Sequence, residues 1–206
     1  MAVITIARQF GAGGRTLGKL IAEALGYALI DEEIVEAVAL EADVSNDWAD
    51  AIAKETGSEG FLDRLVTKLG PFRKGYMNIA MEKKPGYLDG HLYISLLYKV
   101  IPQIASKDNV VIIGRGGQYI LENHPNTYHF MMIADLEYRI NFMMKHYNID
   151  PKQAKYVVEK QEKRRFNLYR YFARTDYDDP GLYNLVFNMN RVNMDKALSM
   201  VCQLVK

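Results

Sequence analysis

A glycine-rich stretch near the N-terminus has residue types and a spacing that can bind an anion. It reads Gln9-Phe10-Gly11-Ala12-Gly13-Gly14-Arg15-Thr16. Glycines let the backbone wrap closely around a ligand, Arg15 brings a positive charge, and the Thr16 hydroxyl can bind Mg²⁺. The stretch therefore predicts a phosphate-binding turn.

This stretch departs from the usual phosphate loop, Gly-x-x-x-x-Gly-Lys-Ser/Thr, at two positions. Gln9 replaces the first glycine and Arg15 replaces the lysine, whereas Gly14 and Thr16 fit the pattern. An arginine keeps the charge and can bind phosphate oxygens through its planar fork. We interpret the stretch as a variant phosphate loop; the alternative is a tight turn with Arg15 in solvent.

The flanking residues predict a strand before the loop and a helix after it. Residues 2–7 are apolar and partly β-branched, as in a buried parallel strand. Apolar residues then recur at helical spacing from Leu17 to Leu25, and Gly26 ends the helix. The N-terminus of such a helix directs N–H groups and the positive end of its dipole at the loop.

Short apolar runs alternate with helical patterns along the rest of the chain. Strands are expected at 27–30, 109–113, 127–133 and 183–189, and helices at 88–105, 117–121, 135–146, 151–172 and from 193 onward. This alternation predicts a three-layer α/β fold, a parallel sheet of about five strands with helices on both faces. The 206 residues fit a single domain, residues 1–206, with a helical acceptor-side insertion at 43–87 and a lid region at 151–181.

Composition narrows the class of protein without naming an activity. The hydrophobic share of 49% and charged share of 25% are those of an ordinary globular protein. A net charge of +1 gives no general reason to expect nucleic acid or an anionic membrane as a partner. The single cysteine, Cys202, cannot form an intrachain disulfide, and no apolar run reaches membrane-spanning length. With no room for a signal peptide before residue 2, we expect a cytoplasmic protein; the oligomeric state stays unknown.

Two further candidates follow predicted strands, where ligands bind in an open parallel sheet. Gly114-Arg115 ends an apolar strand, so Arg115 is expected to face the anion site. Asp31 follows the strand 27–30, and two roles remain open for it: a helix cap, or a carboxylate that holds a metal-bound water or an acceptor hydroxyl. No aspartate ends the strand 109–113, so magnesium would rest on Thr16, the nucleotide and waters.

The long helix expected at 151–172 and the residues after it are strongly basic. The basic residues are Lys160, Lys163, Arg164, Arg165, Arg170 and Arg174. After a phosphate loop and several strands, such a segment is typical of a lid that closes arginines over a triphosphate. Two alternatives remain: a solvated basic face, or an RNA-binding patch in which Phe166, Tyr169, Tyr171 and Phe172 stack on bases.

Together these segments resemble the cytidylate kinase-like family of phosphate-loop proteins. The matching residues are Ile6 to Arg15, Ile113 to Gly116, Glu162 to Arg165, Tyr169 to Tyr171, Asp179-Pro180 and Tyr183 to Leu185. In that family Arg-Gln-Phe/Tyr-Gly-Ser/Ala-Gly-Gly-Arg is the normal form of the loop. The resemblance spans nearly the whole chain.

The resemblance implies a site for ATP and Mg²⁺. The ATP phosphates would lie on Gly11, Ala12, Gly13, Gly14, Arg15, Thr16 and Leu17, and Thr16 would bind the metal. Arg115 would lie near the phosphates of both substrates, and Arg165 and Arg170 would be the arginines of the lid. True cytidylate kinases, which the family resembles more distantly, phosphorylate CMP or dCMP; here the acceptor-side segment 31–35 contains no arginine.

The leading hypothesis is ATP- and Mg²⁺-dependent phosphoryl transfer to a small acceptor, with CMP as the first candidate. Arg15, Arg115, Arg165, Arg170 and Asp31 are the candidate catalytic residues. One alternative is a nucleotide- or phosphate-binding regulatory protein without turnover. A weaker alternative is an RNA-binding module that uses the basic helix.

Overall fold

The computed structural model describes residues 2–31 and 90–205. The helical insertion expected at 43–87 lies outside the described residues, as does any helix that Asp31 would cap. In chain order the described elements are β1 (Val3–Arg8), α1 (Gly14–Leu25), β2 (Ala28–Ile30), α6 (Gly90–Ala105), β3 (Val110–Ile113), α7 (Gly117–Ile120), β4 (Thr127–Ile133), α8 (Leu136–Tyr147), α9 (Pro151–Tyr171), the 3-10 turn Pro180–Leu182, β5 (Leu185–Asn188) and α10 (Met194–Val205).

The described strands form a five-stranded parallel sheet in the order β2-β3-β1-β4-β5. β1 is central, and its Ile4 pairs with Val111 of β3 on one side and Tyr128 of β4 on the other. The predicted α/β class with a parallel sheet is therefore confirmed. Because all strands run the same way, their carboxyl ends gather along one edge, where the phosphate loop follows β1.

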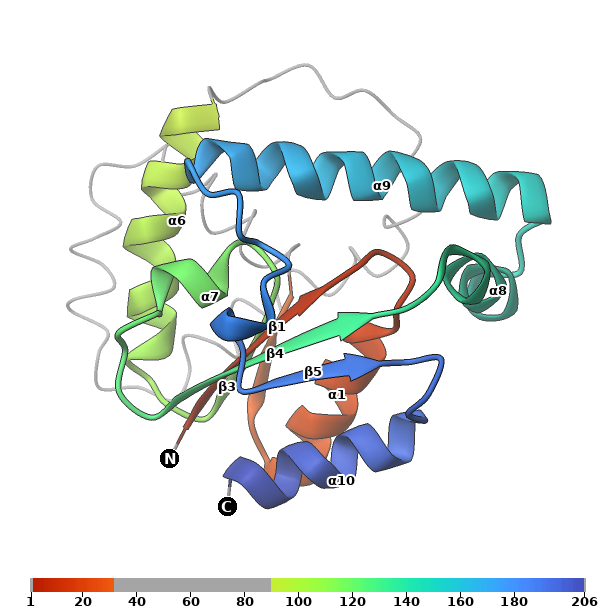
Figure 1. The fold of residues 1–206 in the computed structure, drawn as a ribbon. Coiled ribbons are helices and arrows are strands. Elements are labelled where there is room, and N and C mark those ends of the chain that lie inside the picture. The colour runs from red at the N-terminus through yellow and green to blue at the C-terminus, as the bar shows by residue number, and fades with distance from the viewer. Residues whose placement is uncertain (1, 32–89, 206) are drawn as a thin grey trace.

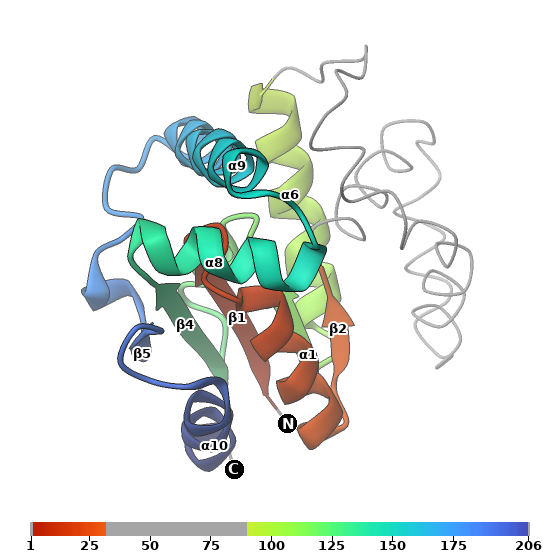
Figure 2. The same cartoon turned by 90° about the vertical axis from the view of Figure 1, so that its right-hand side faces the viewer.

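Successive side chains of each strand point to opposite faces of the sheet, so each strand contributes apolar side chains to both faces. Ile4 and Ile6 pack in the core beneath α1 and α10, whereas Val3 packs in the core beneath α6. Every residue from Val3 to Ile6 is buried, as expected for a strand covered on two sides. Figures 1 and 2 show the resulting three layers, with α1 and α10 on one face and α6 with α7 on the other.

A third apolar cluster lies beyond the carboxyl edge of the sheet. α8 and α9 pack together there through Met143, Ala154 and Val157, and Phe10 of the phosphate loop packs against this cluster. In Figure 1 α8 lies at the side to which β4 and β5 point, and α9 runs across the upper part of the view. This helix pair therefore covers the loop from outside the sheet.

Most element boundaries lie close to the expected ones. β4 coincides with the expected strand 127–133, and the Asp150 side chain caps α9 by accepting a hydrogen bond of 2.9 Å from the Gln153 N–H. β5 is shorter than the expected strand 183–189, because Tyr183 still belongs to the end of the 3-10 turn that begins at Pro180. Local cap and turn residues thus decide where these elements begin and end.

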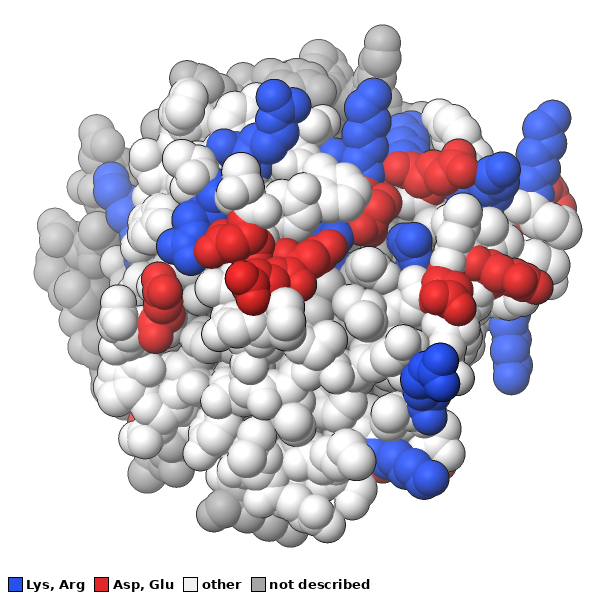
Figure 3. Space-filling model, in the orientation of Figure 1, with Lys and Arg blue, Asp and Glu red and all other residues white. Residues whose placement is uncertain are grey.

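Charged side chains are mixed on the face seen in Figure 3. Lys and Arg lie over α9 in the upper part of that view, with Asp and Glu among and below them, and the lower part is largely uncharged. No helix in residues 2–31 or 90–205 is long and apolar enough to cross a membrane.

The central strand should carry much of the folding free energy. Ile4 is fully buried, so Ile4→Ala should lower the free energy of unfolding by about 2–5 kcal/mol, the usual cost of a large-to-small core change. Val186, 37% exposed on the edge strand β5, provides the control Val186→Ala. Urea denaturation measures the free energy of unfolding of both variants. An equal loss of this free energy in the two variants would contradict the conclusion that the central strand contributes more to stability than the edge strand.

A buried histidine gives stability a pH dependence. His129 of β4 is buried, with Nδ1 2.6 Å from the Thr5 hydroxyl, and burial lowers its pKa below 6.5. As the pH falls through about 6.5, the unfolded chain gains a proton that the folded chain does not, so the free energy of unfolding falls. Urea denaturation at about pH 7.5 and about pH 5.5 should show a larger fall for the wild type than for His129→Gln. The same pH dependence in both proteins would exclude His129 as its source.

Candidate functional site

The loop between β1 and α1 has the backbone geometry of an anion site. Gly11 and Gly13 both have φ of 88°, in the left-handed region that glycine adopts without strain. Gly13 caps α1 without a side chain, so the first N–H groups of the helix face the loop. This arrangement combines close backbone approach with the positive end of the helix dipole.

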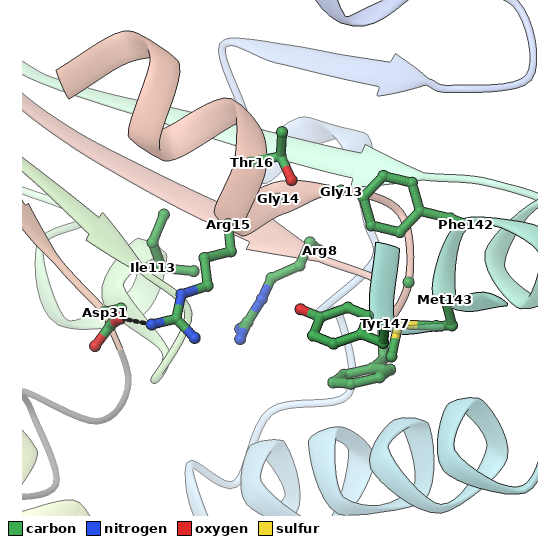
Figure 4. Close-up of a pocket in the computed structure, with 12 residues that line it drawn as sticks. Arg8, Gly13, Gly14, Arg15, Thr16, Asp31, Ile113, Phe142, Met143 and Tyr147 are labelled. Atoms are coloured by element: carbon green, nitrogen blue, oxygen red, sulfur yellow. Dashed lines mark hydrogen bonds and ion pairs between the residues drawn. The ribbon is translucent and has the colours of Figure 1, made fainter. Parts of the chain in front are cut away.

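A pocket opens in front of this loop. Its walls come from the loop and α1, the ends of β1, β2 and β3, and the C-terminal half of α8 (Figure 4). The residues that line it are Arg8, Phe10, Gly11, Gly13, Gly14, Arg15, Thr16, Asp31, Ile113, Phe142, Met143 and Tyr147. The pocket thus has a polar side at the strand ends and an apolar, aromatic side at α8.

Five of the seven residues expected to hold phosphates line the pocket; Ala12 and Leu17 do not. Both of these are fully buried. The Ala12 N–H donates to the Gln9 carbonyl oxygen at 3.1 Å, and the Leu17 N–H donates to the Gly13 carbonyl oxygen at 3.0 Å. Their backbone amides therefore close the turn and the first turn of α1.

Arg15 and Asp31 form an ion pair across the pocket. The Arg15 Nη2 atom lies 2.6 Å from Asp31 Oδ2, and the two side chains are 40% and 11% exposed. The pair joins the start of α1 to the end of β2, so it draws the guanidinium toward the β2 side of the site (Figure 4). The sequence suggested both residues as candidates but not that they bind each other.

Gln9, which replaces the first glycine of the usual loop, connects the loop to the carboxyl end of β4. Its side-chain Oε1 accepts a hydrogen bond of 3.0 Å from the Ala134 N–H, and its own N–H donates to the Met132 carbonyl oxygen at 2.9 Å. Both partners lie at the carboxyl end of β4 or just beyond it. A glycine could not make the first of these contacts, so this departure from the usual pattern attaches the loop to the sheet.

Glu162 of α9 holds the loop from the other side. Its Oε2 accepts a hydrogen bond of 3.0 Å from the Phe10 N–H and lies 3.7 Å from Nη1 of Arg139 on α8. Arg139 in turn donates to the Ala134 and Phe10 carbonyl oxygens, at 3.1 and 3.4 Å. The second oxygen, Oε1, accepts from Arg165 at 2.6 Å. One carboxylate therefore joins the loop, α8 and α9.

The three arginines expected near the phosphates do not line this pocket. Arg165, with 7% of its side chain exposed, is held between Glu162 and Asp178. Burial lowers its pKa, but the hydrogen bonds that Arg165 donates to Asp178 and Glu162, with the charges of these carboxylates, outweigh this effect and raise the pKa above its ordinary value. Arg115 has its guanidinium 5.9 Å from the ring centre of Tyr93 on α6, and Arg170 is exposed on α9. None of the three lines the pocket.

Arg8, by contrast, lines the pocket; the sequence placed it at the end of a strand, within the family-like stretch Ile6 to Arg15, but gave it no specific role. It is the last residue of β1, and its side chain runs beneath Gly14 toward Gly114. Its place directly before the loop, at the carboxyl end of a central strand, is the signal that could have identified it.

The donor atoms of the pocket suit magnesium better than a softer metal. The Thr16 hydroxyl and the Asp31 carboxylate, which line it, supply the hard oxygen ligands that Mg²⁺ prefers. In residues 2–31 and 90–205 no three His, Cys, Asp or Glu side chains gather into a metal site. A magnesium ion would therefore need phosphate oxygens and waters as further ligands, as it commonly does in nucleotide sites.

Removing the Glu162 carboxylate should loosen the loop and α9 together. Glu162→Ala leaves the partly buried Phe10 N–H and Arg165 without one acceptor, so the free energy of unfolding should fall by about 1–3 kcal/mol. Glu159→Ala is the control, because Glu159 on the same helix is 55% exposed and makes only a 3.9 Å contact with Lys155 among the interactions described. Urea denaturation compares them. A loss that is no larger for Glu162→Ala would show that this contact contributes little.

Comparison with known proteins places this chain in a family. The cytidylate kinase-like family model matches residues 3–191. An uncharacterized protein from Eubacterium ventriosum ATCC 27560 has a similar structure, with a TM-score of 0.64 and 19% identity over 100% of this chain and 98% of the other. A gluconokinase from Sinorhizobium meliloti 1021 has a TM-score of 0.51 and 13% identity over 99% and 93% of the two chains. These likenesses concern the fold alone, and no curated protein sequence matches. The family match covers most of the chain, and the chain therefore belongs to the cytidylate kinase-like family.

Proposed function

We propose that this protein transfers the γ-phosphoryl group of ATP to a small acceptor, and that CMP is the first acceptor to test. One observation carries the proposal: a glycine turn and the N-terminus of α1 open into a pocket that also contains two guanidinium groups. Membership of a kinase-like family supports the same reaction class.

On the donor side, the backbone N–H groups of Gly13, Gly14 and Arg15 would bind the ATP phosphates. The Arg15 guanidinium, at the rim of the pocket, would neutralise charge that develops on the transferred group. Magnesium, when bound at the Thr16 hydroxyl, would supply further neutralisation of the phosphate oxygens. Catalysis would then depend mainly on positioning and charge, with little covalent chemistry by the protein.

On the acceptor side, Asp31 is the carboxylate that can meet an incoming hydroxyl. Its Oδ2 is bound to Arg15, and the side chain is 11% exposed toward the pocket. The carboxylate would orient Arg15 and accept a hydrogen bond from the acceptor. Both tasks need the same position at the end of β2.

A nucleotide-binding regulatory protein without turnover is the second candidate. The observation that favours it is the engagement of Arg165 by Glu162 and Asp178, at 2.6 and 2.7 Å, away from the pocket. A lid arginine held in this way cannot neutralise a transition state unless both ion pairs break. Such a protein would bind ATP without producing ADP.

Two of the aromatic residues considered for RNA binding, Phe166 and Tyr169, pack within the fold, whereas Tyr171 is 46% exposed. Tyr169 is buried and stacks on Tyr177 with ring centres 5.3 Å apart, and Phe166 also contacts Tyr177. The basic side chains over α9 are interspersed with acidic ones on the face in Figure 3. Stacking platforms for bases need exposed rings along a basic groove.

Loss of Arg15 tests the kinase proposal. Arg15→Ala should lower kcat/KM for acceptor-dependent ADP formation by about 100- to 1,000-fold, as expected when one group that stabilises transition-state charge is removed. Lys19→Ala provides the control, because Lys19 lies on the same helix and is 61% exposed. A coupled assay for ADP with CMP, other nucleoside monophosphates and small alcohols measures both variants.

Two results would separate the candidates. Wild-type protein that binds ATP in calorimetry but forms no ADP with any acceptor would contradict the kinase proposal and support the regulatory one. Turnover that Arg15→Ala leaves unchanged would show that this arginine does not act in the reaction.

A further inference from the structure

The backbone of Phe10, at the start of the phosphate loop, is held on both of its polar sides by charged side chains of the helix pair. Its N–H donates to Glu162 Oε2 on α9 at 3.0 Å, and its carbonyl oxygen accepts from Arg139 Nη1 on α8 at 3.4 Å. The two side chains lie beside each other, with Glu162 Oε2 3.7 Å from Arg139 Nη1. Glu162 and Arg139 therefore grip one residue together, and we call this pair the Phe10 clamp.

The clamp fixes the peptide that leads into the glycine turn. At the other end of this peptide, the Gln9 carbonyl oxygen accepts from the Ala12 N–H at 3.1 Å. Because a peptide unit is planar, hydrogen bonds at its carbonyl and at its N–H fix the direction of the whole unit. Phe10 and Gly11 line the pocket, so the direction of this peptide determines how the turn faces the pocket.

The turn also packs directly on the helix that carries Arg139. A Cβ atom on Gly11 would lie 2.9 Å from both the Cβ atom and the carbonyl oxygen of Arg139, closer than real Cβ atoms come to a neighbour. The backbone of Gly11 therefore touches α8 at the same residue that binds the Phe10 carbonyl oxygen. Close packing seats the turn on α8, and the Glu162 carboxylate holds it there from α9.

A carboxylate next to an anion site has to be neutralised, because an unpaired negative charge would repel phosphate. Glu162 Oε1 accepts from Arg165 Nη2 at 2.6 Å, and Arg165 Nη1 donates to Asp178 Oδ1 at 2.7 Å. With Arg139 these residues form a chain of alternating charges, two cations and two anions. The Glu162 side chain is 14% exposed and that of Arg165 is 7% exposed, so ions in solution screen this pair little. The carboxylate can therefore bind the loop without opposing a phosphate.

We infer that Glu162 is a positioning residue for nucleotide binding: by accepting the Phe10 N–H, it holds the phosphate loop in the conformation that receives the phosphates. This rests on the proposed function and deepens it, since it names a residue that acts on the site without lining the pocket. Glu162 acts through the Phe10 backbone, and Arg165 acts through Glu162. A purely structural role would instead make Glu162 equivalent to the other carboxylate bound to Arg165.

Two variants of similar shape test the hydrogen bond to the loop. Glu162→Met removes both the charge and the acceptor, whereas Glu162→Gln removes the charge but keeps an amide oxygen that can accept from the Phe10 N–H. Calorimetry measures the affinity for the non-hydrolysable analogue AMP-PNP with Mg²⁺. Glu162→Met should weaken this affinity about 10-fold or more, as expected when a hydrogen bond to a charged group is lost. Glu162→Gln should stay within about threefold of wild type.

Asp178→Ala is the matched control. Asp178 is the second carboxylate bound to Arg165, and its printed side-chain bonds in the described part of the chain go to that arginine rather than to the loop. Its AMP-PNP affinity should stay within about twofold of wild type, although urea denaturation should show lower stability for this variant and for both Glu162 variants. Arg139→Met removes the other half of the clamp and should weaken AMP-PNP binding too, which keeps the test available if Glu162→Met does not fold.

Four results would overturn the inference. They are unchanged AMP-PNP affinity in folded Glu162→Met, an equal loss in Glu162→Met and Glu162→Gln, an equal loss in Glu162→Met and Asp178→Ala, and wild-type protein that binds no AMP-PNP. Failure of the kinase proposal looks different, because AMP-PNP would still bind in a way that depends on Glu162 while no acceptor yields ADP.

Discussion

The Glu162 carboxylate is the contact on which the region beyond the sheet depends. Past the ends of the strands no ladder of backbone hydrogen bonds continues, so the loop amides need side-chain partners or ligands. Glu162 binds the Phe10 N–H through one oxygen and Arg165 through the other, with Arg139 beside it. Glu162 therefore holds the phosphate loop against the helix pair α8 and α9. The position of α9 directly affects the conformation of the loop.

The sheet and the glycine turn after β1 could be predicted from the sequence, because both depend on local signals. Apolar β-branched runs predicted the strands, helical patterns predicted α9, and glycines predicted the tight turn after β1. The partners of individual side chains could not be predicted in the same way. The Gln9 side chain binds the N–H of Ala134, 125 residues further along the chain. Sequence patterns do not predict contacts between residues so far apart.

The sequence pattern also could not predict which arginines are neutralised within the fold and which lie at the pocket. A basic helix predicts that cations gather, but not which of them is neutralised within the fold. Arg165 is surrounded by two carboxylates and three aromatic rings, so its charge stabilises the packing of α9. Arg8, with no run of basic residues around it, lies at the pocket instead. Its significance depends on the neighbouring strand end, which only the three-dimensional fold brings near.

The passage of Arg8 between Gly14 and Gly114 makes three distant positions a single steric unit. The absence of a side chain at positions 14 and 114 leaves room for the Arg8 side chain, and it also allows the turns at these positions. Substitutions within the set should be strongly non-additive, because once Arg8 is shortened a methyl group at Gly14 meets far less resistance. A shorter residue at the end of β1 would therefore relax the steric requirement for glycine at positions 14 and 114.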